Sequence, residues 1–85
     1  MPAVKVVEKK LGRERAFGQA IKAGADDGSD LIEVDPRQSP REYMDTVVHE
    51  AIHIADPVMP ERKVAALSRK ISRVMWQQKF RKVDL

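Results

Sequence analysis

The sequence predicts an α+β domain in which a small three-stranded sheet is followed by a hairpin of two helices. Three observations carry this prediction: short β-branched segments in the first 35 residues, a change to helical spacing after Pro36, and a short loop between two helical segments. The chain has 85 residues, which is room for one domain, so residues 1–85 are expected to form a single unit.

Three segments in the first half of the chain have the composition of short strands. Residues 4–8 are β-branched and alternate loosely, and residues 31–35 are interpreted as a strand that Pro36 ends. Residues 16–23 alternate more weakly, and Gly18 within them leaves a helix as the alternative. The alternation places three side chains on one side of this segment: Phe17, Gln19 and Ile21.

A capping box marks the start of the first helix. The Ser39 hydroxyl can accept a hydrogen bond from the backbone N–H of Glu42, the Glu42 carboxylate can accept one from the N–H of Ser39, and Pro40 suits the first helical position. Pro57 disfavours the helical conformation in the residue before it. The first helix is therefore predicted over residues 40–55.

Pro60 starts the second helix, which is predicted over residues 60–79. Apolar residues follow helical spacing along it: Val64, Leu67, Ile71, Val74 and Met75. Because the loop before it is short, the two helices are expected to pack antiparallel. Trp76 lies near the apolar stripe and is interpreted as a core residue, with stacking on a nucleic-acid base as the alternative.

The first helix carries the sequence His49-Glu50-Ala51-Ile52-His53. Histidines four residues apart lie on one face of a helix, one turn apart, where both can reach a single zinc ion. Glu50 is rotated away from that face, so its carboxylate can take a proton from a water molecule that the zinc binds and whose pKa falls toward about 7. This division of roles indicates metal-assisted hydrolysis.

Both histidines of the chain belong to this motif, and chance predicts such a match in only about three of a thousand similar chains. The alternative is that two surface histidines happen to align. A catalytic zinc usually has three protein ligands, and without another His or any Cys the third must be a carboxylate or come from outside the chain. Glu61 is favoured, because an antiparallel second helix would begin beside His53. Two other carboxylates follow the motif: Asp56 and Asp84.

Residues 46–53 resemble the active-site helix of the zincin metallopeptidases, and residues 31–80 resemble the very small SprT-like or minimal-zincin proteins of bacteriophages and bacteria. In those proteins a strand ending in Asp-Pro, a capped helix with the HExxH motif, a loop with proline, a glutamate and a basic helix with tryptophan follow in order. The corresponding residues here are Asp35 and Pro36, His49 to His53, Asp56 and Pro57, Glu61, and Trp76.

The resemblance implies a minimal zincin-like core and zinc as the cofactor. It implies His49, His53 and Glu61 as ligands and Glu50 as the general base of a metallopeptidase. Its substrate would be a peptide or protein. The edge strand of a zincin sheet commonly aligns a peptide by strand addition. Two segments would serve if they lie at an edge: 31–34 and 16–23.

Charge is distributed unevenly along the chain. Residues 1–60 carry a net charge of −3 and residues 61–85 a net charge of +6. The basic segment 62–82 is interpreted as a solvated helix face, with binding of a nucleic acid or an acidic partner as the alternative. A further alternative function is a non-catalytic protein-binding module that zinc stabilises, since so small a domain leaves few residues to form a substrate cleft.

The sequence contains no cysteine, which excludes disulfides and thiolate metal sites. It shows no signal peptide and no apolar stretch long enough to span a bilayer. We therefore expect a protein without membrane association, located in the cytoplasm, or in the host cytoplasm if a bacteriophage encodes it.

Overall fold

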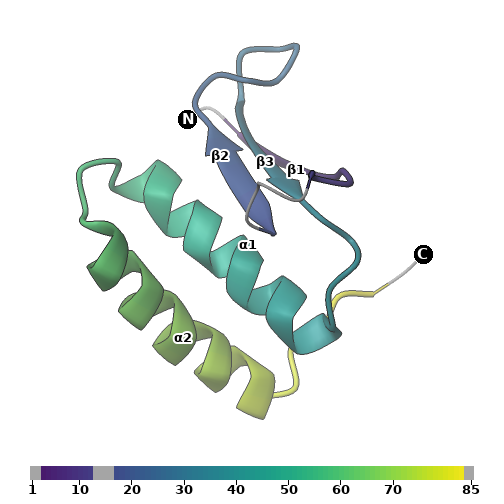
Figure 1. Ribbon diagram of the computed structural model, residues 1–85, viewed down its shortest axis with the longest axis vertical. Coiled ribbons are helices and arrows are strands. Elements are labelled where there is room, and N and C mark those ends of the chain that lie inside the picture. Colours follow the sequence, from purple (N-terminus) through teal and green to yellow (C-terminus); the bar gives the residue numbers. More distant parts are fainter. Residues whose placement is uncertain (1–2, 13–16, 84–85) are drawn as a thin grey trace.

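Residues 3–12 and 17–83, which the computed structural model describes, form a three-stranded sheet followed by two helices (Figure 1). The predicted α+β class and the order of elements are confirmed. The elements are β1 (Val4–Glu8), β2 (Gly18–Ile21), β3 (Asp30–Val34), α1 (Pro40–Ala55) and α2 (Glu61–Gln77).

The central strand of the sheet is β3, and the strand order is β1-β3-β2. β1 pairs with it in parallel and β2 antiparallel, so that Val6 and Ala20 both lie opposite Ile32. Of the two segments considered for aligning a peptide, only β2 lies at an edge. Residues 31–34 cannot serve, because both of their neighbours in the sheet are already strands of this chain.

Strand β2 is shorter than the predicted 16–23, of which residue 16 lies outside the described part of the chain. The strand ends at Ile21 because the Ile21 carbonyl accepts a hydrogen bond from the Gly24 N–H at 3.2 Å, and Ala23 has a positive φ of 54°. These features form a turn that leads the chain back toward β3.

Helix α1 has the predicted bounds and the predicted capping box. Ser39 Oγ accepts from the Glu42 N–H at 3.2 Å, and Glu42 Oε1 accepts from the Ser39 N–H at 3.3 Å. Helix α2 begins and ends slightly inside the predicted 60–79. It ends at Gln77 because Lys79 has a positive φ of 68°, a conformation that a helix does not contain.

Helix α1 lies between the sheet and α2, so the domain has three layers (Figure 1). The sheet turns Ile32 and Val34 toward α1, and both side chains are fully buried. Among the described elements, α2 packs against α1 and against no strand. The position of α2, and of any residue it carries, therefore depends on its contact with α1.

Small residues form the contact between the two helices. Val64, Ser68 and Ser72 recur at one-turn intervals along α2 and are completely buried. Ser72 Oγ donates to Asp45 Oδ1 of α1 at 3.0 Å, whereas Ser68 Oγ donates to the Ala65 carbonyl of its own helix. Two serines in the interface let the helix backbones approach closely.

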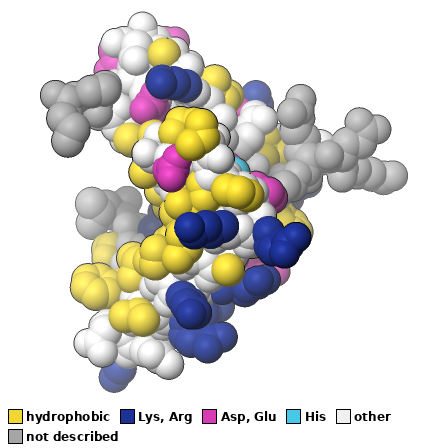
Figure 2. All heavy atoms as spheres, turned by 90° about the vertical axis from the view of Figure 1, so that its left-hand side faces the viewer, with side chains coloured by type: hydrophobic (Ala, Val, Ile, Leu, Met, Phe, Trp, Pro, Cys, Tyr) yellow, Lys and Arg dark blue, Asp and Glu magenta, His cyan; other side chains and the backbone are white. Residues whose placement is uncertain are grey.

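The predicted apolar stripe of α2 is only partly the buried face. Val64 is buried, but Ile71 and Val74 are 43% and 59% exposed. The prediction that this stripe packs against α1 was wrong at these two positions. Ser68 and Ser72 pack there instead, and serines contribute nothing to a hydrophobic pattern. Figure 2 shows hydrophobic side chains running across the face of the molecule on which α2 lies, beside a group of lysines and arginines.

Trp76 is half-buried at the margin of the core rather than inside it. The Arg81 guanidinium lies 3.4 Å from its ring centroid, and that of Arg41 lies 5.7 Å away. The segment after α2 then returns to the sheet, where Lys82 forms an ion pair with Glu8 of β1. In the described residues, neither helix combines the length and the hydrophobicity that a bilayer crossing requires.

Candidate metal centre

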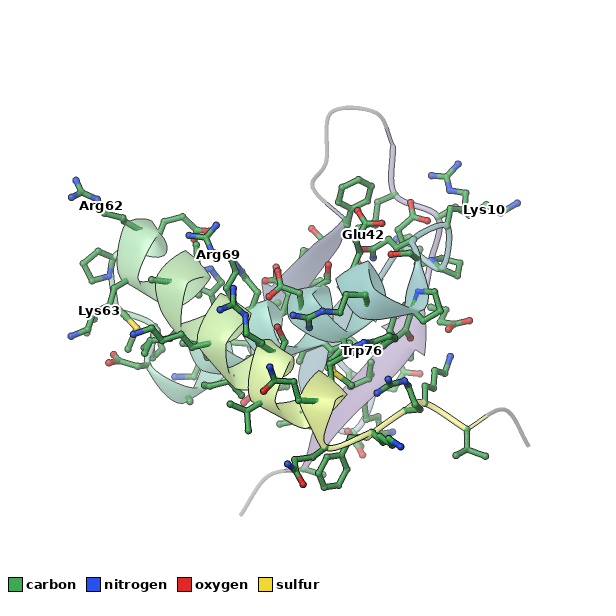
Figure 3. The ribbon with its side chains drawn as sticks, turned by 90° about the horizontal axis from the view of Figure 1, so that it is seen from below. Lys10, Glu42, Arg62, Lys63, Arg69 and Trp76 are labelled. Carbon is green, nitrogen blue, oxygen red and sulfur yellow. The ribbon has the colours of Figure 1, made fainter. Side chains whose placement is uncertain are left out.

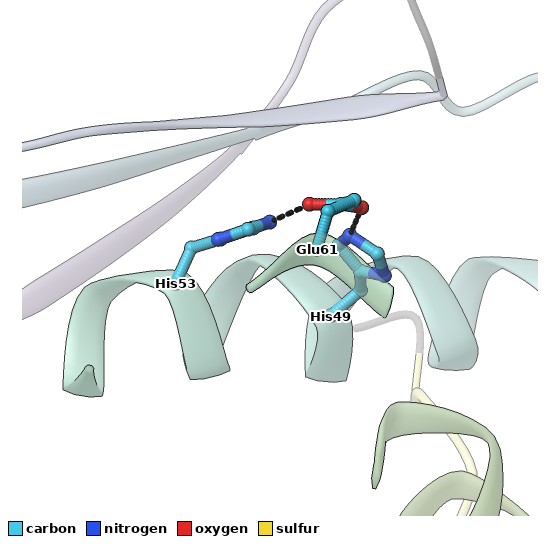
Figure 4. Close-up of side chains that lie close together, drawn as sticks. All are labelled: His49, His53 and Glu61. Atoms are coloured by element: carbon cyan, nitrogen blue, oxygen red, sulfur yellow. Dashed lines mark ion pairs between the residues drawn. The ribbon is translucent and has the colours of Figure 1, made fainter. Parts of the chain in front are cut away.

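His49 and His53 lie one turn apart on α1, as their spacing predicts. Their ring centroids are 5.0 Å apart, and the two side chains are 21% and 27% exposed. Both rings turn toward the start of α2, so their Nε2 atoms point into one small volume (Figure 4).

Glu61 completes this group from the first residue of α2. Its Oε1 lies 2.6 Å from His49 Nε2, and its Oε2 lies 2.8 Å from His53 Nε2 (Figure 4). A tight loop makes this possible: the Asp56 carbonyl accepts from the Met59 N–H at 3.1 Å, and Pro60 then starts α2 alongside α1. One carboxylate therefore bridges both imidazoles.

Asp56, one of the two other carboxylates considered as third ligand, does not join this group. Asp56 is the C-terminal cap of α1, where its N–H bonds to the Ile52 carbonyl. Asp84 lies outside the described residues. Among the described residues, His49, His53 and Glu61 are the group that could hold a metal ion.

The donor set fits zinc. Two imidazole nitrogens and one carboxylate oxygen are a common ligand set of catalytic zinc, which binds such atoms at about 2.0–2.2 Å. The three donor atoms lie within 4.8 Å of one another, close enough for small side-chain rotations to bring them to one ion. The Glu61 side chain is 67% exposed, so the group is open to solvent on that side.

Glu50 lies beside this group but turns toward the sheet. It is only 9% exposed, and burial raises the pKa of its carboxyl group, although the nearby His49 and His53 favour the charged form. A raised pKa makes the carboxylate a stronger base than a carboxylate in water. The predicted general base is thus beside the histidines and partly dehydrated.

Gly18 of β2 makes this arrangement possible. A Cβ atom at Gly18 would lie 2.6 Å from Thr46 Cγ2 and 3.4 Å from Glu50 Cγ. Any larger residue would push α1 away from the strand. In the sequence, Gly18 indicates a weak strand, yet an isolated glycine in a strand is also the usual signal of close backbone approach.

A cleft of about 420 Å³ lies between β2 and α1, next to this group. Gly18 and Ala20 line it from the strand, and Glu50, His53 and Ile54 line it from the helix. The cleft therefore joins an edge strand to the predicted base and to one predicted ligand.

The edge of β2 presents unpaired peptide groups to this cleft. The Phe17 carbonyl accepts from the Asp35 N–H of the chain beyond β3 at 2.8 Å, which makes these two residues a hydrogen-bonded pair. Hydrogen-bonded and non-hydrogen-bonded pairs alternate in an antiparallel ladder. Gly18 and Ala20 therefore direct their N–H and C=O groups away from β3, toward the open edge.

An ion pair between the buried Asp35 and the exposed Arg37 fixes the end of β3, from which the chain enters α1. Asp35 is buried and accepts hydrogen bonds from Arg37 Nη2 at 2.7 Å and from the Leu11 N–H at 3.0 Å. Arg37 Nη2 also donates to the Leu11 carbonyl at 2.8 Å. The Arg37 guanidinium and these hydrogen bonds hold the pKa of Asp35 well below its usual range. The sequence alone predicts Asp35 as the end of a strand and gives no sign of this ion pair.

No protein-family model matches the chain, and neither a curated protein nor a solved structure shows significant similarity to it. The resemblance of residues 31–80 to SprT-like or minimal-zincin proteins stays a prediction. The chemistry of the site has to be judged from its own residues and their geometry.

Proposed function

We propose that the chain is a zinc-dependent hydrolase of the metallopeptidase type. One observation carries the proposal: a single carboxylate, that of Glu61, meets the Nε2 atoms of both His49 and His53, with Glu50 beside them facing a cleft. This is the donor set and the neighbouring base that metal-assisted hydrolysis of an amide requires.

Each of these residues has a separate part. His49, His53 and Glu61 would hold the zinc, which when bound supplies a Lewis acid that polarises a carbonyl and lowers the pKa of water to about 7. Glu50 takes a proton from the attacking water and returns it to the leaving amine. Its raised pKa suits both transfers, since a base works best when its pKa lies near the operating pH.

The shape of the cleft favours an extended peptide as substrate. The outward peptide groups of Gly18 and Ala20 can pair with a peptide as a further strand of the sheet. Such a strand would lie along the cleft in front of Glu50 and His53. Backbone pairing of this kind holds a substrate without selecting its side chains, so specificity has to come from elsewhere in the molecule.

The test begins with zinc per chain, measured by elemental analysis after dialysis against trace zinc. About one zinc is expected in the wild type and in Glu50→Gln, and none in His49→Ala. Zinc-loaded wild type should cleave an unfolded protein such as reduced casein, and Glu50→Gln should lose about 10²–10⁴-fold in rate. Full cleavage by zinc-loaded Glu50→Gln would contradict the proposed mechanism.

The runner-up function is a non-catalytic module whose zinc only fastens the two helices. It is favoured by the packing of α2, which contacts α1 alone and whose first residue, Glu61, meets the histidines. A zinc ion would then raise the melting temperature without supporting turnover. Zinc-dependent cleavage that disappears in Glu50→Gln would exclude this alternative.

A further inference from the structure

A second cavity lies at the other end of α1, between the start of β2 and the C-terminal half of α2. Its volume is about 300 Å³. Phe17, the residue just before β2, lines the cavity on one side. Thr46 lines it from α1, and Arg69 and Arg73 line it from α2. Phe17 and Thr46 line this cavity, and Gly18 and Glu50 line the first cleft. Because Phe17 is next to Gly18 in the chain and Thr46 is one helical turn from Glu50, the cavity extends the first cleft along β2 and α1.

Arginines distinguish this cavity, which we call the arginine cavity. Arg41, Arg69 and Arg73 all line it. Among residues 3–12 and 17–83, no carboxylate lies within ion-pair distance of any of the three. Nη1 of Arg41 is buried, and it finds no hydrogen-bond acceptor in the described part of the chain. Within the part of the chain that the structure describes, these guanidinium groups therefore have no ion-pair partner.

The acidic residues of the same cavity are already engaged. Asp45 Oδ1 accepts from Ser72 Oγ at 3.0 Å, and Glu42 Oε1 accepts from Ser39 Oγ at 2.7 Å. The carboxylates thus serve helix packing and capping, and they leave the arginines to an outside acceptor. Figure 3 shows Arg69 leaving α2 on the side toward which Glu42 projects from α1.

We propose that the arginine cavity binds a carboxylate of the substrate peptide, on the C-terminal side of the cleaved bond. This proposal rests on the proposed peptidase function for its site of cleavage. Antiparallel strand pairs outnumber parallel ones about two- to threefold, and a peptide antiparallel to β2 would run from the Ile21 end toward Phe17. It would pass His53 and Glu50 first and reach the arginine cavity afterwards.

The distance suits a residue close to the cleaved bond. Asp45 and Thr46 precede His49 by about one helical turn, or roughly 5–6 Å, and an extended peptide advances about 3.3 Å per residue. The carboxylate would therefore belong to a residue about two to four positions beyond the cleaved bond. It can be an Asp or Glu side chain or the C-terminal carboxylate, since guanidinium groups bind either one in bidentate fashion.

The same residues argue against a nucleic acid in this cavity. Glu42 and Asp45 repel any anion in the cavity, but they oppose a chain of phosphates more than a single carboxylate, because the repulsion grows with the number of negative charges. By helical position, Arg69 and Arg73 lie on the cavity side of α2, and Lys63 and Lys70 lie about 60–120° further round the helix, on the face that points away from α1.

The test measures peptide binding separately from cleavage. Zinc-loaded Glu50→Gln, which cannot hydrolyse the probe, is titrated against fluorescent nonapeptides of Ala, Thr and Val by polarisation. One peptide carries two Gln near an amidated C-terminus, a second carries two Glu there, and a third keeps the Gln pair but has a free C-terminal carboxylate. The second, the third or both should bind about tenfold more tightly than the first, and the comparison identifies which carboxylate is recognised.

Two double variants locate the effect. Arg69→Gln with Arg73→Gln should remove the preference for the carboxylate while leaving the affinity for the neutral peptide unchanged. Lys63→Gln with Lys70→Gln removes the same charge from the face of α2 that points away from α1, and it should keep the preference. Circular dichroism verifies that both variants are folded.

Several outcomes would overturn the proposal: equal binding of all three peptides, a preference that survives in the arginine variant, equal losses in the lysine control, or an oligonucleotide that competes as well as the acidic peptide.

The two proposals can also fail separately. A preference that depends on the arginines, without turnover by the wild type, supports the cavity and not the peptidase. Turnover by the wild type without any preference for a carboxylate supports the peptidase and not the role of the arginine cavity.

Discussion

Gly18 of β2 and Thr46 of α1 lie so close together that a methyl group on Gly18 would stand 2.6 Å from Thr46 Cγ2. Thr46 Cγ2 belongs to a branched side chain on a packed helix, so Gly18→Ala requires α1 to shift. We expect it to lower the free energy of unfolding by about 1–3 kcal/mol, as overpacking usually does. Zinc affinity should fall as well, because His49 and His53 move with α1. Urea unfolding and zinc titration measure the two effects.

Gly12→Ala is the matched control, since no atom of the described residues lies within 4 Å of a Cβ atom at that position. It should leave zinc affinity unchanged and alter stability by less than about 1 kcal/mol. If Gly18→Ala behaved in the same way, the close approach of β2 and α1 would not be a requirement of the site.

The third zinc ligand can be identified by comparing Glu61→Gln with Asp56→Asn. Both changes remove one carboxylate of similar shape near the end of α1. Only Glu61 contacts both histidines, so we expect Glu61→Gln to weaken zinc binding by about 100-fold or more and Asp56→Asn to leave it within about threefold. Competition with a chelator of known affinity gives both values. The opposite ranking would move the third ligand to Asp56.

The buried serines of α2 predict a link between helix packing and zinc binding. Ser68→Leu would force a large side chain between the helices and should cost about 1–3 kcal/mol of stability. Because Glu61 lies on α2 and the histidines on α1, widening the gap should also weaken zinc binding. Thermal unfolding with and without zinc measures both, since the stabilisation by zinc shrinks with its affinity.

Ser68→Ala is the control for this change. The Ser68 hydroxyl bonds to the Ala65 carbonyl of its own helix, so its loss breaks no contact with α1. We expect a change in stability within about 1 kcal/mol and an unchanged zinc affinity. A weaker zinc site in both variants would point to an effect within α2 and not to the spacing of the helices.

Local signals in the sequence predicted the helices well. The capping box at Ser39 and the proline after Asp56 fixed the bounds of α1, since both act within a few residues. The same locality explains the histidine pair, whose spacing alone places it on one helix face. The prediction that Glu61 lies beside the histidines needed one further inference: the loop between the helices is so short that the chain must reverse its direction there.

Features that depend on packing between distant segments were not predicted. The buried face of α2 carries Ser68 and Ser72 because α1 lies close to it. A hydrophobic pattern in the sequence cannot predict an interface made of serines. The role of Gly18 and the arginine cavity arise where β2, α1 and α2 meet, and residues about 30 to 55 positions apart contribute to each. The place of β3 at the centre of the sheet likewise follows from strand pairing and not from its own composition.

The contact between Asp35 and Arg37 predicts how stability depends on pH. The folded protein holds the pKa of Asp35 far below the value of about 3.9 expected in the unfolded chain. Above about pH 5 the carboxylate is charged in both states, and its contacts contribute fully to stability. As the pH falls through 3.9, the unfolded chain binds a proton that the folded protein does not, so stability declines toward the folded-state pKa.

Asp35→Asn should therefore destabilise the protein at pH 7 and flatten the decline below pH 5, because an amide takes up no proton and cannot pair with Arg37. Melting temperatures between pH 7 and pH 3 measure this. Asp26→Asn, at an exposed loop position, controls for the loss of one negative charge. The acid dependence would have another origin if Asp35→Asn kept the slope of the wild type. A flattened slope would instead show that the ion pair of Asp35 with Arg37, at the junction of β3 and α1, accounts for the loss of stability in acid.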